Sequence, residues 1–199
     1  MDFMASKDQR KISDFQFHDL TLDRWSDFEA LFGARGACGG CWCMWWRLKN
    51  KDYELNKGEE NKRAMNYLVA TGATPGIIAY DHGVPVGWCS VAPREEFVRL
   101  QNSRILKPVD DLPVWSVVCL FVEKGNRGQG VSTNLLRAAI EFVRERGGTI
   151  VEGYAIEPKA GKLPDAFAYP GPAAAYRNAG FKEVLRRSET RPIMRHIIR

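Results

Sequence analysis

The sequence predicts one α/β domain over residues 1–199, with helices flanking a sheet. Short apolar runs of strand character alternate with amphipathic runs of helical spacing, and a glycine-rich junction joins a strand to a helix. Of the 199 residues, 45% are hydrophobic. A chain of this size buries roughly 70% of its unfolded surface, so it can build a core without disulfides.

The predicted elements follow one another in the order β-α-α-β-β-β-α-β-α-β-β. They are strands at 10–20, 76–80, 86–91, 114–122, 149–156, 182–188 and 192–198, and helices at 22–32, 59–70, 131–143 and a short one ending at Ala179.

The elements of the N-terminal half rest on local signals. The 22–32 helix has apolar residues at helical spacing and ends at Gly33, and the 59–70 helix has a similar apolar stripe. The tripeptide 81–83 between two apolar runs indicates a hairpin. An insertion at 94–112 is expected to hold one or two helical turns.

The C-terminal half is organised around the 131–143 helix, which has one apolar and one polar face. Paired glycines at 147–148 end it, and apolar strands at 114–122 and 149–156 lie on either side of it in sequence. A loop rich in Gly, Pro and Ala spans 159–172 and leads to the last short helix and two strands.

The junction before the long helix has the features of a phosphate site. Gly128 and Gly130 let the backbone bend tightly and bring consecutive N–H groups close to a ligand. The first turn of the helix adds unpaired N–H donors and the positive end of its dipole. Arg127 adds a positive charge, so this junction is expected to bind phosphate.

Several known phosphate loops and catalytic turns do not fit. A P-loop would need Lys where Val131 stands, and a dinucleotide fingerprint would need a small residue at Thr133. A nucleophile elbow would need glycine at Asn134. The pattern Arg-x-x-Gly-x-Ser instead resembles the acetyl-CoA-binding motif of the GCN5-related N-acetyltransferase (GNAT) superfamily, Gln/Arg-x-x-Gly-x-Gly/Ala. Ser132 departs from it at the last position.

A second pattern lies downstream at the spacing that this family requires. Residues 176–181, Tyr-Arg-Asn-Ala-Gly-Phe, resemble the family's Tyr-x-x-x-Gly-Phe, a helix end capped by Gly180. The family's upstream Asn and Ala are replaced by Tyr169 and Pro172, which indicates a reshaped acceptor site. The two motifs cover the C-terminal half, and the N-terminal half has no such signature.

The resemblance implies a mixed, mostly antiparallel central sheet flanked by helices. Its central strand and the next one would splay apart at a bulge to admit the pantetheine arm of acetyl-CoA, whose amides would pair with the backbone of Leu120 and Val122. Tyr176 would protonate the departing CoA thiolate, with a core tyrosine as the alternative. The residues implied to bind pyrophosphate are Arg127, Gly128, Gln129, Gly130, Val131 and Ser132.

A general base is expected among the carboxylates near the opening between the 114–122 and 149–156 strands, because an acceptor amine must lose a proton. Glu152 lies in an otherwise apolar strand, where burial would raise its pKa. The alternative for Glu152 is an outward-facing strand residue. Glu157 is the next candidate, followed by Asp110 and Asp111.

Cys38, Cys41 and Cys43 have the spacing of half a metal site. Structural zinc uses four ligands, usually as two pairs, and the sequence offers no second pair. No metal is therefore predicted, and the segment is expected to be reduced.

Trp42, Trp45 and Trp46 lie in the same segment. The resemblance places this segment beside the acceptor pocket, where the rings would form a wall for an apolar or cationic acceptor. Packing of these rings in the core is the alternative.

Composition limits location and partners. Five cysteines, an odd number, argue for a reducing cytoplasm. No apolar run approaches the ~20 residues of a membrane span, and the start lacks a signal core. The net charge of +5 is concentrated in residues 177–199. Without a binding motif, this argues for solvated arginine faces of strands and against a nucleic-acid partner.

These observations predict a cytoplasmic enzyme that moves an acetyl group from acetyl-CoA to a primary amine by direct attack. The acceptor is a small molecule or a peptide amine, and a homodimer is left open. The alternative is a non-catalytic acyl-CoA-binding module with the cysteine segment as a redox or metal sensor.

Overall fold

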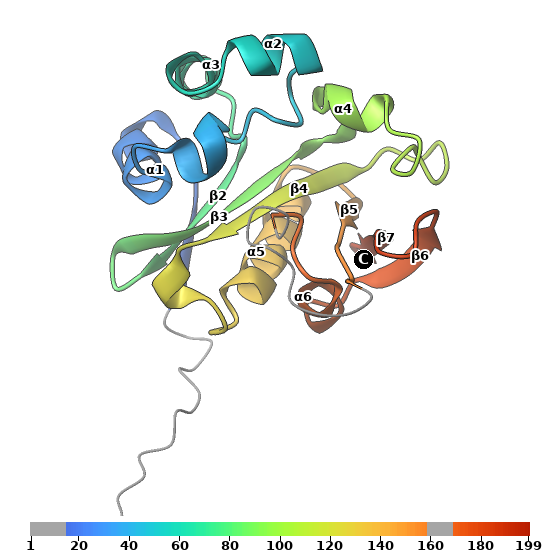
Figure 1. The fold of residues 1–199 in the computed structure, drawn as a ribbon. Helices are drawn as coiled ribbons and strands as arrows, with labels where there is room; N and C mark the ends of the chain where they lie inside the picture. The colour runs from blue at the N-terminus through green and yellow to red at the C-terminus, as the bar shows by residue number, and fades with distance from the viewer. Residues whose placement is uncertain (1–14, 159–168) are drawn as a thin grey trace, which may run out of the picture.

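The computed structural model describes residues 15–158 and 169–199 (Figure 1). The start of the first predicted strand and most of the predicted 159–172 loop lie outside the described residues.

Seven strands form one mixed sheet in the order β1-β2-β3-β4-β5-β7-β6. Neighbouring strands are antiparallel except β4 and β5, which are parallel. The predicted mixed, mostly antiparallel sheet is therefore confirmed. The strands are β1 (Phe15–Asp19), β2 (Gly76–Asp81), β3 (Val84–Pro93), β4 (Trp115–Val122), β5 (Ile150–Tyr154), β6 (Lys182–Arg186) and β7 (Pro192–Ile197).

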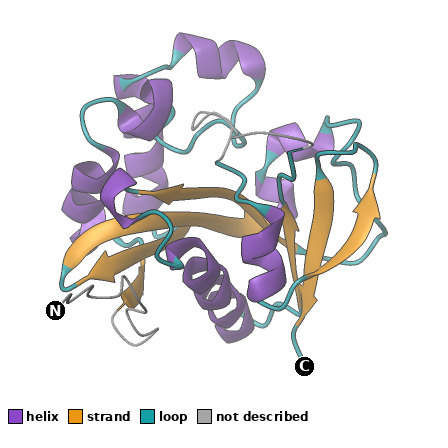
Figure 2. Cartoon of the chain, turned by 60° about the horizontal axis from the view of Figure 1, so that its bottom comes forward, coloured by secondary structure: helices purple, strands orange, loops and turns teal. Residues whose placement is uncertain are grey.

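Helices cover both faces of this sheet (Figure 2). In Figure 1, α1 (Trp25–Phe32), α2 (Asn50–Leu55), α3 (Glu59–Ala70) and α4 (Val98–Gln101) lie on one side, and α5 (Val131–Glu145) and α6 (Ala173–Asn178) lie on the other. Across the two described ranges, no helix combines the length and apolarity that crossing a membrane requires.

The helices beyond the predicted set are short. Helix α2 falls in a charged segment without apolar periodicity, so the sequence did not indicate it. Helix α4, preceded by the 3₁₀ turn Arg94–Glu96, supplies the helical turns expected in the 94–112 insertion. Two further 3₁₀ turns, Leu22–Arg24 and Lys124–Asn126, precede α1 and α5.

Helix α5 packs its apolar face onto the sheet as predicted. Val131, Leu135, Ala139 and Val143 are buried together with side chains of β2, β3 and β4. The helix ends at Glu145, and Gly147, two residues later, has a φ of 73°. The next residue donates its N–H to the Val143 carbonyl at 2.9 Å, which satisfies an orphan carbonyl of the last turn.

The sheet opens between β4 and β5. These strands pair only at their starts, where residues 115–117 lie beside residues 151–153. The β3–β4 register shifts between Ser90 and Val91, which face Cys119 and Val117, so Val118 is an extra residue on β4. A bulge of this kind bends a strand and is common beside functional sites. The second half of β4 thus turns away from β5.

Candidate functional site

The loop between β4 and α5 presents backbone N–H groups at the start of a long helix. Gly128 and Gly130 have φ angles of 76° and 81°, the left-handed region that favours glycine. A Cβ built on Gly128 would meet no atom within 4 Å. The first intrahelical bond runs from the Asn134 N–H to the Gly130 carbonyl, so the N–H groups of residues 131–133 precede it. The loop therefore offers several donors and room for an anion.

A cavity of about 220 Å³ lies over this loop. The amino end of α5 gives it a positive potential that favours anions. Arg127 donates from Nε to the Val122 carbonyl at 3.1 Å, so a cofactor amide that bonds to Val122 must use the carbonyl's other lone pair. The cavity is lined by Val122, Asn126, Arg127, Gly128, Gly130, Val131, Ser132, Thr133, Pro172, Ala175 and Asn178.

The predicted Gln129 contributes to the loop's own structure. Its Nε2 donates to the Gly125 carbonyl at 3.0 Å. This bond spans the turn that precedes α5 and fixes its path.

The gap between β4 and β5 is bridged by residues 169–172. The Leu120 N–H donates to the Tyr169 carbonyl at 2.6 Å, and the Ile156 N–H donates to the Gly171 carbonyl at 2.9 Å. Gly171 has a φ of 81°, and a Cβ there would lie 2.5 Å from Cδ1 of Leu120, so a side chain at this position would be strained and would have to move Leu120. The N–H of Leu120 expected to pair with the cofactor is thus paired within the chain. A ligand that uses this N–H must displace Tyr169.

Tyr176 lies on α6 and is fully buried. Its hydroxyl donates to the Pro170 carbonyl at 2.9 Å, and its ring packs edge-on against Phe181. Gly153 on β5 makes room for the ring, because a Cβ there would lie 2.1 Å from Cε1 of Tyr176. Burial raises the pKa of Tyr176 well above its ordinary value, so the phenol is neutral and holds its proton. As predicted, Gly180 caps this helix with a φ of 89°.

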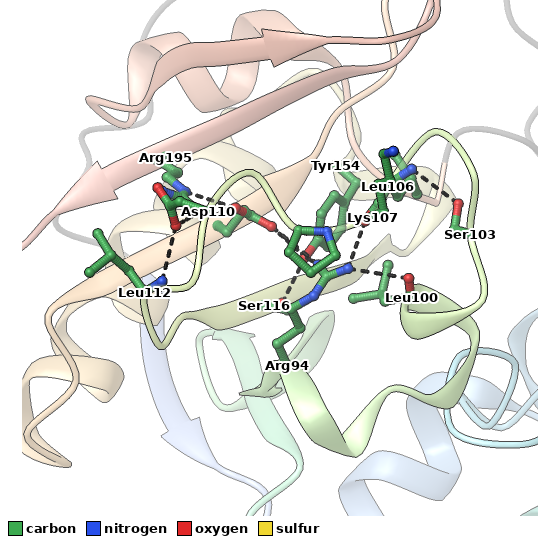
Figure 3. Close-up of polar contacts among 12 residues, drawn as sticks. Arg94, Leu100, Ser103, Leu106, Lys107, Asp110, Leu112, Ser116, Tyr154 and Arg195 are labelled. Atoms are coloured by element: carbon green, nitrogen blue, oxygen red, sulfur yellow. Dashed lines mark hydrogen bonds and ion pairs between the residues drawn. The ribbon is translucent and has the colours of Figure 1, made fainter.

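Glu152 on β5 belongs to a buried charge cluster with Arg94 and Arg195, the two arginines labelled in Figure 3. Its side chain is 1% exposed, so it does not face outward. Arg195 Nε donates to one carboxylate oxygen at 2.7 Å, and Arg94 Nη1 donates to the other at 3.2 Å. The Tyr154 hydroxyl donates to the second oxygen at 2.7 Å and lies 2.8 Å from the Ser116 hydroxyl. Both oxygens of the carboxylate are therefore held by arginine side chains.

The same arginines attach the 94–112 insertion to the sheet (Figure 3). Arg195 binds both oxygens of Asp110, at 2.6 and 3.0 Å. Arg94 donates from Nη2 to the carbonyls of Leu100 and Leu106, at 3.2 and 2.7 Å. These contacts place Glu152 where it can hold the insertion, and they disfavour it as the acceptor of an amine proton.

Two of the next candidates for a base are also paired. Glu157 binds Arg186 and Arg177 at 2.6 and 2.7 Å, and these two arginines lower its pKa. The bidentate bond from Arg195 likewise lowers the pKa of Asp110. A carboxylate with a lowered pKa is a weaker base, so these contacts disfavour both residues as acceptors of an amine proton.

The three tryptophans of the cysteine segment do not lie together. Trp42 is 3% exposed and stacks on Phe32, with ring centroids 5.7 Å apart, inside the core beneath α1. Trp45 and Trp46 instead line a second cavity of about 490 Å³. Of the three rings predicted to form the acceptor wall, Trp42 is packed in the core, and only Trp45 and Trp46 line a cavity.

The cysteine segment packs its third thiol onto the sheet. The Trp88 indole N–H donates to Cys43 Sγ at 3.2 Å. The Cys119 thiol, followed by Trp88 and Ser90, lowers the pKa of Cys43 to about 7 against the effect of burial. Cys41 is partly exposed, and Cys38 is exposed. Within residues 15–158 and 169–199, no three His, Cys, Asp or Glu side chains are grouped to hold a metal ion.

Sequence reasoning missed Arg94 and Arg195, which bind Glu152, and Arg99, which lines the second cavity. Arg195 could have been found from the strand register, because it lies directly opposite Glu152 on β7. Arg94 and Arg99 lie in the irregular insertion, where no periodic pattern shows which way a side chain points.

Comparisons with known proteins agree with this architecture. The acetyltransferase (GNAT) family matches residues 42–158, more than half of the chain. No curated protein matches. A GNAT-family acetyltransferase from Streptococcus agalactiae superposes with a TM-score of 0.56 at 10% identity, covering 94% of this chain and 97% of that one. The yncA protein of Salmonella typhimurium, solved with acetyl-CoA, gives 0.52 at 11%, covering 94% and 95%.

A third structure is the paia N-acetyltransferase from Thermoplasma acidophilum in complex with coenzyme A. Its TM-score is 0.50 at 14% identity, covering 92% of this chain and 98% of that one. At these identities the three structures establish a shared fold. Together with the match over residues 42–158, they show that the chain belongs to the acetyltransferase (GNAT) family.

Proposed function

We propose that the protein is an acetyl-CoA-dependent N-acetyltransferase that acetylates a primary amine. The observation that carries this proposal is the β4–α5 loop, whose two left-handed glycines and free helix start form an anion site beside an opened sheet. Membership of the GNAT family and the CoA-bound structures of the same fold support it.

In this proposal acetyl-CoA extends from the β4–α5 loop to the gap between β4 and β5. Its pyrophosphate binds the backbone of residues 127–132, and its pantetheine arm enters the gap between β4 and β5. The arm accepts a hydrogen bond from the Leu120 N–H. The present bond from this N–H to the Tyr169 carbonyl must therefore break. Because one hydrogen bond replaces another, the exchange costs little in hydrogen-bond energy.

The reaction needs no covalent enzyme intermediate. The neutral amine nitrogen attacks the thioester carbon and forms a C–N bond, and it gives up its proton to solvent water. The C–S bond then breaks to release CoA as a thiolate, which takes up a proton. Tyr176 is the proposed proton donor to that thiolate, because it is a neutral phenol in the wall of the gap. We assign Glu152 a structural role, since two arginines hold its carboxylate.

Substitution of Gly128 by aspartate is expected to abolish CoA binding. The position faces open space over the loop, where a carboxylate would meet the pyrophosphate charge. The left-handed φ of 76° adds backbone strain. Titration calorimetry of CoA into the full chain measures the loss.

The matched control is Gly147→Asp, which adds the same charge at a φ of 73°, also in open space, at the other end of α5. This variant should bind CoA as the parent does. Equal CoA binding by parent and Gly128→Asp would overturn the placement. A module that only binds acyl-CoA would show the same binding losses, so acetyl-CoA turnover with amines separates the two functions.

A further inference from the structure

The 490 Å³ cavity is lined by residues of α4, by the start of α2 and by the segment before it. In Figure 1 these two helices lie on the opposite side of the sheet from α5. The volume of the cavity is that of a small-molecule site. It is lined by Trp45, Trp46, Lys49, Asn50, Val98, Arg99, Asn102, Ser103 and Tyr169. Tyr169 links it to the gap between β4 and β5, because the carbonyl of this same residue holds the Leu120 N–H. A molecule in this cavity would therefore adjoin the place of acetyl transfer. We refer to it as the Trp46–Arg99 cavity.

The charge of the lining is positive. Arg99 and Lys49 are its two charged residues, and the described lining contains no carboxylate. Arg99 is held in place: its Nε donates to the Leu48 carbonyl at 2.9 Å, and its Nη1 bonds to Asn50. A fixed guanidinium loses little freedom when it binds an anion.

Two buried donors of this lining have no partner among the described residues. They are Arg99 Nη2 and Trp46 Nε1, and the Trp46 side chain is 8% exposed. Unpaired buried donors are costly, and such a group in a native structure calls for an acceptor. Neither nitrogen can accept a hydrogen bond, so the complementary ligand atom is an oxygen with lone pairs.

The aromatic rings beside this cavity already contact the side-chain cation of Arg99. The Arg99 guanidinium stacks 3.6 Å from the centroid of Trp45 and 5.3 Å from that of Tyr53. A cationic ligand would meet two positive side chains and find the face of Trp45 occupied. Of the apolar and cationic acceptors expected from the sequence, this charge favours the apolar one.

We propose that the Trp46–Arg99 cavity binds a small acceptor amine that also carries a carboxylate on an apolar or aromatic body. The carboxylate would accept from Arg99 and Trp46, with Lys49 adding charge at the rim. The body would lie against the ring of Trp46, and the amine would point toward the gap. This assignment of substrate class rests on the proposed acetyl transfer.

The test compares two probes that differ in one charge, 4-(aminomethyl)benzoate and 4-(aminomethyl)benzamide. Calorimetry on the full chain without acetyl-CoA measures binding alone, and CoA release with acetyl-CoA present measures transfer. The parent should bind the benzoate roughly tenfold more tightly than the amide, the size of one charge-assisted hydrogen bond. Preferential binding of the benzoate without acetyl transfer would contradict the proposed function but would still support an anion site in this cavity.

Three variants locate the effect. Arg99→Gln should abolish the preference for the benzoate, and Lys49→Gln should reduce it a few-fold. Lys51→Gln removes the same charge from an exposed residue of α2 outside the lining and should change nothing. Because Lys49 is exposed, its variant tests the site even if Arg99→Gln unfolds.

Three outcomes would overturn the proposal. The first is equal affinity of the parent for the two probes, or no benzoate binding at millimolar concentration. The second is a preference that survives in both Arg99→Gln and Lys49→Gln. The third is faster acetylation of peptides that carry an N-terminal acidic residue than of small amino acids, which would replace the small-molecule acceptor by a peptide.

Discussion

Replacement of Tyr176 by phenylalanine is expected to lower kcat by about 10²–10⁴-fold, the usual contribution of a positioned general acid. The affinity for acetyl-CoA should stay nearly unchanged, because the phenyl ring keeps its packing against Phe181 and Gly153. A fall in kcat without a change in cofactor binding marks an interaction made only in the transition state.

The surroundings of Tyr176 supply the physical reason. Burial raises the pKa of the phenol, so it is fully protonated at neutral pH but is also a weaker acid. The departing thiolate would form in the same apolar gap, where burial raises the pKa of a thiol as well. Displacement of residues 169–171 by the cofactor would also free the hydroxyl from the Pro170 carbonyl. The proton would then be available where the sulfur arrives.

A control separates this chemistry from the loss of a hydrogen bond. Tyr80 lies on β2, outside the proposed site, and its hydroxyl donates to Asp27 at 2.7 Å. Tyr80→Phe removes this hydroxyl. Both variants lose one hydrogen bond, a stability cost of about 1 kcal/mol. With an accepted amine as substrate, Tyr80→Phe should turn over like the parent. If Tyr176→Phe does so too, Tyr176 is structural and solvent protonates the thiolate.

The features that the sequence predicted well depend on residues that are close together in the sequence. The Arg127–Ser132 loop could be recognised because glycine is required wherever φ is positive, and Gly128 and Gly130 are in that region. The end of α6 followed from Gly180 for the same reason. The apolar face of α5 could be predicted from the 3.6-residue spacing of its apolar residues. This spacing is clear because the helix packs against the sheet on one side only.

The parts that could not be predicted depend on distant or irregular backbone. Glu152 meets Arg94 and Arg195, which lie 58 and 43 residues away, so no local pattern shows the pairing. Trp42 and its neighbour have φ angles of 44° and 58°. Such backbone has no period from which the direction of a side chain could be inferred. The bond between Leu120 and Tyr169 likewise joins two segments that only the fold brings together.

Substitution of Glu152 by glutamine is expected to lower the free energy of unfolding by about 3–5 kcal/mol. The Arg195 and Arg94 side chains are 8% and 11% exposed, so both guanidinium groups would stay in poorly solvated surroundings without this carboxylate. Glutamine keeps the volume and one oxygen, so the change removes charge rather than packing. A loss of this size is a large fraction of the 5–15 kcal/mol by which a typical domain is stable. Urea denaturation followed by circular dichroism measures it.

The control for this prediction is Glu141→Gln, which breaks an exposed ion pair with Arg144 on α5. Exposed pairs contribute about 0–1 kcal/mol, so this variant should remain close to the parent. The same Glu152→Gln protein also tests the two roles of the carboxylate. If Glu152 holds the insertion, kcat per folded molecule, measured well below the melting temperature, should stay within the parental range. Parental stability combined with a large fall in kcat would instead identify Glu152 as the general base. The stability and rate measurements on one variant therefore decide between anchoring and proton transfer.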